Sequence, residues 1–316
     1  MTKPHANRQA PRPAGPLSVG DTPELTLEAL VGGGEAIARV DGLPVFVPLG
    51  VPGDVVRARV ISTKPGYARA LISEVVSPGP GRITPPCAVF GRCGGCQWQA
   101  LAYAEQVAWK TRLVAEALQR QGGIEPGPVL RDCLPSPSPW AYRNKVHWAT
   151  GKEKGKWRIG LFEPRSHAIV DAAECAIQDA ANNEALGVLR DLLYEFRVVP
   201  YDEAKDTGWL RSAFAKRGHR TNELMLGLVT RSAEFPQAEA FVAAARARLP
   251  GLTTIVQNVH PRRGNKLLGD ETIALHGPGT IREQIGTGPN GRVLTFAISA
   301  SAVAQSRAPC AWKMRR

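Results

Sequence analysis

Short apolar runs separated by turn residues dominate the first quarter of the chain. They lie at residues 25–31, 36–40, 43–49, 55–62 and 68–76, and each is rich in Val, Leu, Ile or Ala. A pair such as Asp41-Gly42 between two runs is typical of a hairpin turn. Short strands at this even spacing predict a small closed β-barrel of the oligonucleotide-binding type. The pattern alone does not distinguish a barrel that binds a ligand from one that does not.

The pattern after the barrel changes to helical spacing and then to a mixture. Apolar positions within residues 103–121 predict a helix that ends at Gly122-Gly123. Beyond residue 141 strands and helices mix, which predicts an α+β domain. We expect strands at residues 145–150, 158–164, 224–230 and 253–259, and helices at residues 180–196 and 236–249.

These patterns predict a multi-domain chain of five segments. Residues 1–20 contain four Pro and three basic residues but no acid, which is typical of a disordered basic tail. The small all-β barrel follows at residues 21–80, a Cys-rich loop with its helix at 81–125, and the central α+β domain at 126–295. Residues 296–316 form a separate tail without a helical or strand pattern at its end.

Charge restricts the class of partner. The 316 residues include 40 Lys and Arg against 28 Asp and Glu, a formal charge of +12. An excess of this size favours a polyanion such as nucleic acid. The sequence has no apolar run long enough to span a membrane and no secretory signal. We therefore expect a cytoplasmic protein, a monomer, with no membrane partner.

Three of the six cysteines are grouped in one Gly-rich segment, PPCAVFGRCGGC. Cys87, Cys93 and Cys96 can converge on one centre because the glycines permit tight turns and leave N–H groups near the sulfurs. A four-thiolate site needs one more ligand, and the candidates are Cys133, Cys175 and Cys310. Four thiolates hold either zinc or an iron–sulfur cluster, and this spacing favours a cluster while leaving zinc open.

Several segments resemble one family. GRCGGCQWQALAYAEQVAWK (91–110) resembles the cluster loop of the bacterial RNA (uracil-5-)methyltransferases, which modify uracils in 23S rRNA and tRNA. The predicted barrel resembles the TRAM domain of many members, and the combination favours the 23S rRNA type. Further segments resemble signatures of the family's central domain: YRNKVHW (142–148), IGLFEPRSHAIVDAAECAIQ (159–178), LMLGLVTRS (224–232) and residues 253–286.

The resemblance implies cofactors and their ligands. Cys87, Cys93, Cys96 and Cys175 match the family's four [4Fe–4S] ligands, and Gln305 stands where a contact of S-adenosylmethionine would fall. In the family, the catalytic groups belong to a C-terminal Rossmann-like methyltransferase domain. No matching Gly-rich turn is recognisable here. We therefore expect that domain to be absent, the reading frame to be lost near residue 303, and no residue of this chain to be catalytic.

Cations and aromatic rings interleave along the predicted central domain. This combination is what proteins use to bind single-stranded RNA, although a solvated basic face has the same composition. The candidates for RNA contact are Arg143, Lys145, Trp148, Lys156, Arg158, Arg165, Arg211, Arg262 and Arg263.

The sequence thus predicts the N-terminal portion of an S-adenosylmethionine-dependent 23S rRNA (uracil-5-)methyltransferase. This portion is expected to bind RNA, 23S rRNA before tRNA, to hold a [4Fe–4S] cluster and to be inactive alone. The alternative is a stand-alone RNA-binding iron–sulfur or zinc protein without enzymatic activity.

Overall fold

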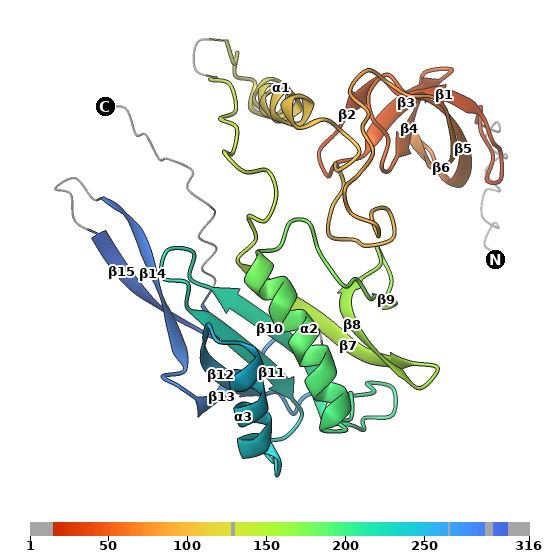
Figure 1. The fold of residues 1–316 in the computed structure, drawn as a ribbon. Helices are drawn as coiled ribbons and strands as arrows, with labels where there is room; N and C mark the ends of the chain where they lie inside the picture. Colours follow the sequence, from red (N-terminus) through yellow and green to blue (C-terminus); the bar gives the residue numbers. More distant parts are fainter. Residues whose placement is uncertain (1–14, 128–129, 265, 288–292, 303–316) are drawn as a thin grey trace, which may run out of the picture. The chain divides into compact units, whose positions relative to one another are not determined.

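The structure is a computed structural model that describes residues 15–127, 130–264, 266–287 and 293–302 (Figure 1). The chain divides into two compact units. The first, called here the barrel unit, comprises residues 1–85 and 97–134. The second, the α/β unit, comprises residues 86–96 and 135–316. The Cys-rich loop therefore lies within the barrel unit in sequence but belongs to the α/β unit in space.

Six strands of the barrel unit form one sheet in the order β1-β5-β6-β4-β3-β2. Alternate residues of its strands, such as Val56, Ala58 and Val60, are fully buried, as the one-sided apolar pattern requires. The predicted first strand is two short strands, because β1 pairs with β5 whereas β2 pairs with β3. The strands are β1 (Glu24–Thr26), β2 (Ala29–Leu30), β3 (Ala36–Val40), β4 (Leu43–Val47), β5 (Val55–Lys64) and β6 (Tyr67–Ser77).

The helix of the barrel unit, α1 (Tyr103–Gly122), ends where the glycines predict. Gly123 has a φ of 62°, in the left-handed region, and its N–H bonds to the carbonyl of Leu118. A residue without a Cβ adopts this conformation at little cost, which is why Gly commonly ends helices.

The α/β unit contains a seven-stranded sheet in the order β13-β12-β11-β10-β7-β8-β9. β11 and β12 are parallel and are joined through α3, while the other neighbouring strands are antiparallel. A separate pair, β14 (Thr280–Thr287) and β15 (Val293–Ser299), forms an antiparallel hairpin. The elements of the main sheet and its helices are β7 (Lys145–Glu153), β8 (Lys156–Phe162), β9 (Ile169–Val170), α2 (Ala180–Glu195), β10 (Leu210–Arg217), β11 (Leu224–Thr230), α3 (Ala238–Arg248), β12 (Leu252–Val259) and β13 (Glu271–His276).

Both faces of this sheet are covered. The two helices α2 and α3 pack on one face, where Leu189, Phe241 and Leu226 share one buried cluster (Figure 1). Ile281 and Ile298 of the β14–β15 hairpin contribute to a second cluster on the other face. The strands buried on both faces therefore read as continuous apolar runs rather than as alternating ones.

Gly227 in β11 is required by close packing across the sheet. A Cβ at this position would lie 2.1 Å from the ring of Phe214 on the neighbouring strand. Any larger residue would displace that ring, which is itself buried at 1% exposure.

Five strands of the α/β unit were not predicted from the sequence, and one of them, β9, has only two residues. β10 carries Arg211, Lys216 and Arg217, which interrupt its apolar pattern. β13 and β14 are likewise rich in polar residues, whereas β15 is mostly apolar but largely exposed. None of the helices in the described residues is both long and apolar enough to cross a membrane.

Candidate cysteine centre and nucleic-acid interface

The Cys-rich loop is anchored to the end of β8. The N–H of Gly94 bonds to the carbonyl of Phe162 over 3.0 Å. Inside the loop, the N–H of Cys93 bonds to Val89 and that of Phe90 bonds to Cys87, at 3.0 and 3.1 Å. These bonds wrap the backbone so that Cys87 and Cys93 lie on the same short turn.

Cys175 is placed by the segment that precedes α2. Residues 141–143 pair with residues 176–177 through backbone bonds, which fixes the path of the chain beside Cys175. The side chain of Asn183 brackets the cysteine, since its Oδ1 accepts the N–H of Cys175 at 3.1 Å and its Nδ2 donates to the carbonyl at 3.2 Å. Sequence reasoning did not select Asn183, because its two bonds reach back to Cys175, eight residues earlier, and no local pattern indicates them.

The thiols influence one another electrostatically. Burial raises the pKa of the Cys93 thiol, and the neighbouring Cys175 and Cys87 raise it further. The N–H of Gly95, 3.4 Å from the sulfur, and the guanidinium of Arg143 act in the opposite direction. Cys87, Cys93 and the remote Cys175 therefore belong to one neighbourhood, which also contains a cation.

A cavity of about 510 Å³ opens beside these residues. Cys87, Cys175 and Asn183 contribute to its wall. Over the ranges that the structure describes, no group of three or more His, Cys, Asp or Glu side chains is arranged to hold a metal ion. The type and number of donors nevertheless fit a four-thiolate centre, because Cys87, Cys93, Cys96 and Cys175 are all partly buried thiols of the same unit.

The two other candidates for a fourth ligand have different surroundings. Cys133 belongs to the barrel unit, where its N–H bonds to Oγ1 of Thr111 at 2.8 Å. Cys310 lies outside the described residues, as does Gln305.

One of the candidates for RNA contact requires a correction. Trp148 is 0% exposed and packs in the cluster beneath α2 and α3. Its ring cannot stack on a base from this position, so the expectation of an RNA contact at Trp148 is wrong. Periodicity alone did not separate a buried ring from an exposed one.

The cationic candidates are divided between two opposite edges of the sheet. Arg143 and Lys145 lie where β7 begins, beside the end of β10. Arg211 begins β10 and stacks on the ring of Tyr201 at 4.2 Å, at the opposite edge. Exposed Arg262 and Arg263 follow β12 at that same opposite edge, since the ends of β11 and β12 are in register.

The remaining candidates lie around the β7–β8 hairpin. Lys156 and Arg165 are exposed, and Arg158 forms an ion pair with Glu153 at 2.9 Å.

Residues 16–72 match the TRAM domain family. The chain is 36% identical to an uncharacterised RNA methyltransferase of Halalkalibacterium halodurans over 285 residues, which are 90% of this chain and 61% of that protein. It is 35% identical to a second such protein of the same organism, over 92% of this chain and 61% of that protein.

A solved structure has the same fold. The tRNA (uracil-54, C5)-methyltransferase of Pyrococcus abyssi, in complex with S-adenosyl-L-homocysteine, superposes with a TM-score of 0.65 at 23% identity, over 90% of this chain and 61% of that one. The barrel is thus a TRAM domain, and the chain is related to RNA methyltransferases. It spans about three fifths of the length of the relatives that it matches.

The comparisons correct two expectations about the chain. Both the absence of a methyltransferase fold and an inactive fragment were predicted, yet nine tenths of the chain align with RNA methyltransferases and with a solved methyltransferase. The prediction relied on one local motif, a Gly-rich turn, whereas the comparisons extend over nine tenths of the chain.

Proposed function

We propose that this chain acts in the S-adenosylmethionine-dependent methylation of uracil at carbon 5 in RNA. The observation that carries the proposal is the alignment of 90% of the chain with proteins called RNA methyltransferases. The TRAM domain and the charge of +12 support RNA as the substrate. We propose 23S rRNA as that substrate, and tRNA is the alternative substrate.

The two cofactors have different parts in this proposal. S-adenosylmethionine supplies the methyl group, and Gln305 is proposed to contact it on the resemblance of the surrounding sequence. The [4Fe–4S] cluster is proposed to be held by Cys87, Cys93, Cys96 and Cys175, whose shared neighbourhood supports this assignment. We assign no nucleophile or base to the described residues.

Methyl transfer tests the activity. The chain is incubated with methyl-labelled S-adenosylmethionine and either a 23S rRNA transcript or a tRNA transcript, and the digested RNA is analysed by mass spectrometry. We expect 5-methyluridine in the 23S rRNA. Label in tRNA alone would overturn the choice of substrate, and no 5-methyluridine in either RNA would overturn the proposed activity of this chain.

Metal analysis tests the cluster. Protein purified without oxygen is expected to be brown, with about four irons per chain. The Cys175→Ser variant should lose this iron, and the matched Cys133→Ser variant should retain it. A colourless protein with one zinc, or iron that survives in Cys175→Ser, would contradict the assignment.

A further inference from the structure

The turn between β10 and β11, residues 218–223, is closed tightly against β14. The N–H of Gly218 bonds to the carbonyl of Glu223, and that of Asn222 bonds to Gly218, both at 2.8 Å. Thr221 donates its hydroxyl to the carbonyl of Arg282 at 2.6 Å. A Cβ at Gly218 would lie 2.3 Å from that same carbonyl oxygen. These contacts fix the backbone conformation of the turn and hold it against β14.

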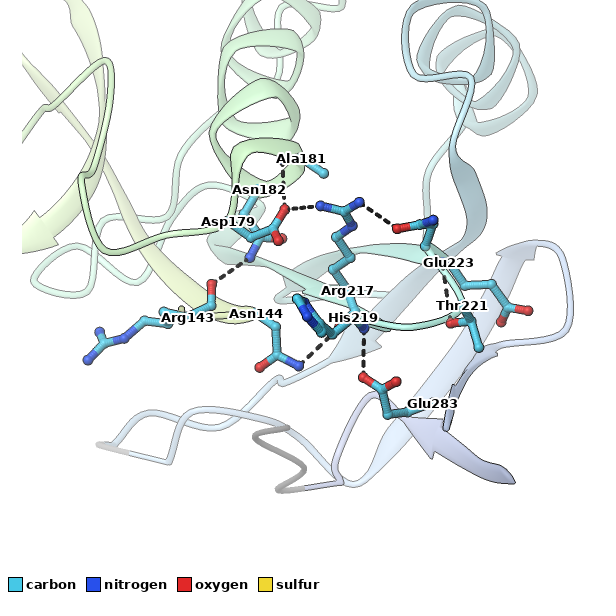
Figure 2. Close-up of polar contacts among 11 residues, drawn as sticks. Arg143, Asn144, Asp179, Ala181, Asn182, Arg217, His219, Thr221, Glu223 and Glu283 are labelled. Atoms are coloured by element: carbon cyan, nitrogen blue, oxygen red, sulfur yellow. Dashed lines mark hydrogen bonds and ion pairs between the residues drawn. The ribbon is translucent and has the colours of Figure 1, made fainter. Parts of the chain in front are cut away.

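A buried carboxylate fixes the tip of this turn. Glu283 is 2% exposed and accepts the N–H of His219 at 2.6 Å and that of Arg220 at 3.1 Å (Figure 2). It also accepts the N–H of Gln284 at 2.8 Å. Because Glu283 binds the backbone of the turn, the side chains of His219 and Arg220 remain at the surface, where both residues are exposed.

The start of β7 adds two cations to the same edge. Asn144, just before β7, and Arg217, at the end of β10, are joined by two hydrogen bonds. The backbone N–H of Arg217 donates to the carbonyl of Asn144 at 2.8 Å, and the side-chain amide of Asn144 donates to the carbonyl of Arg217 at 3.1 Å. Asn144 lies between Arg143 and Lys145, so these bonds place both cations beside the end of β10. In Figure 2 the guanidinium of Arg143 points away from the hydrogen-bonded network.

The carboxylates near this edge have other partners. Asp179 pairs with Arg217, whose guanidinium also bonds to Asn222 at 2.7 Å. Glu223 pairs with Nε of Arg282 at 2.6 Å, and the Arg282 side chain remains 70% exposed. Throughout the described ranges, no carboxylate forms an ion pair with Arg143, Lys145 or Arg220. Arg220 is therefore an exposed cation, Arg143 and Lys145 are partly exposed cations, and Arg282 retains its terminal guanidinium nitrogens.

We infer that this edge of the α/β unit binds the phosphate backbone of the RNA substrate. The proposed basic edge consists of Arg143, Lys145, Arg220 and Arg282, with Glu283 as a positioning residue, and it rests on the RNA-binding function proposed above. Unpaired Arg and Lys side chains on a fixed backbone are the groups that contact phosphates and set the register of a nucleic acid. Arg220 and Arg282 enter this set through the fold, which places the turn beside β14 although the two residues are more than sixty positions apart in sequence.

Salt-dependent RNA binding tests the basic edge. The affinity of the chain for a fluorescein-labelled single-stranded 23S rRNA fragment is measured over a series of NaCl concentrations. The Arg220→Gln and Arg282→Gln variants should bind several-fold more weakly. Each should also make the negative slope of log affinity against log salt shallower by about 0.7, the value for one lost phosphate contact. Arg197→Gln is the matched control, because Arg197 is exposed at the opposite end of α2 and loses the same charge.

The outcomes separate this inference from the function on which it rests. If the wild-type chain binds the fragment, and Arg220→Gln and Arg282→Gln retain its affinity and slope as the control Arg197→Gln does, the proposed basic edge is wrong and RNA binding stands. If the wild-type chain does not bind RNA, both are overturned.

A double-mutant comparison tests Glu283 as a positioning residue. Glu283→Ala should weaken binding and lower the salt slope, and adding it to Arg220→Gln should lower the slope no further, because both act on the same contact. A general loss of structure would instead leave the slope of the folded fraction unchanged. Equal slopes in Glu283→Ala and the wild type would overturn the positioning role.

Discussion

At the scale of single residues, His147 makes the stability of the α/β unit dependent on pH. Its Nε2 bonds to Oγ of Ser212 at 2.7 Å, and its ring stacks on Phe214. Burial, with the charges of Lys145 and Lys216, lowers the pKa of His147 from 6.5 to about 4. The unfolded chain therefore takes up a proton below pH 6.5 while the folded chain does not.

We accordingly expect stability to fall as the pH is lowered from 6.5 towards 4, with a slope of up to about 1.4 kcal/mol per pH unit from this residue. Urea unfolding across this pH range measures the slope. The His147→Gln variant can still bond to Ser212 but does not titrate, so its curve should be flatter. Equal slopes in the two proteins would contradict the assignment to His147.

Lys216 gives a second residue-scale prediction, at alkaline pH. The side chain is 2% exposed, and Nζ donates to the carbonyls of Ser299, Ala300 and Ala302 at 2.8, 2.6 and 2.9 Å. Burial and the charge of Lys145 lower the pKa of Lys216 from 10.5 to about 8. Between these values the unfolded chain holds a proton that the folded chain has lost, so stability should rise with pH.

The Lys216→Met variant tests this sign. It should lack the rise in the free energy of unfolding between pH 8 and 10.5, as measured by urea titration. A rise of the same size in Lys216→Met would show that another group is responsible.

At the scale of elements, the start of α2 depends on Asp179. Its Oδ1 accepts the N–H of Ala181 at 2.9 Å, which caps the helix, and the same carboxylate pairs with Arg217. Asp179→Ala removes the cap and the ion pair, whereas Asp179→Ser keeps a cap. We expect Asp179→Ala to be less stable than Asp179→Ser by about 1 kcal/mol in urea unfolding. Equal losses in the two variants would mean that the cap contributes little to α2.

Elements also show what a sequence pattern can and cannot predict. The apolar runs predicted β5, β11 and β12, because these strands are defined by their own residues. β10 was not predicted because a lysine in the pattern indicates an exposed position. Lys216 is instead buried, and its ammonium group donates to carbonyls more than eighty residues further along the chain. The same limit applies to the site, since spacing groups Cys87 with Cys93 but only the resemblance adds Cys175. Backbone pairing of residues 141–143 with 176–177 is a long-range feature that no local pattern encodes.

At the scale of the whole molecule, the cysteine loop links two parts of the sequence that lie far apart. Residues 86–96 interrupt the barrel unit in sequence but belong to the α/β unit, together with Cys175. A metal centre held by Cys87, Cys93, Cys96 and Cys175 would therefore stabilise the α/β unit, because binding energy is gained only where the ligands are folded. The barrel strands contribute no ligand to it.

Hydrogen exchange measured by mass spectrometry tests this division. Removing iron from anaerobically purified protein should accelerate exchange in residues 86–96 and 169–183, and the Cys175→Ser variant should show the same pattern. Exchange in β5 and β6 should stay unchanged, because each strand keeps its ladder of bonds within the barrel sheet. Equal acceleration in the barrel strands would mean that the metal stabilises the chain as one cooperative whole, and no change near Cys175 would remove it from the centre.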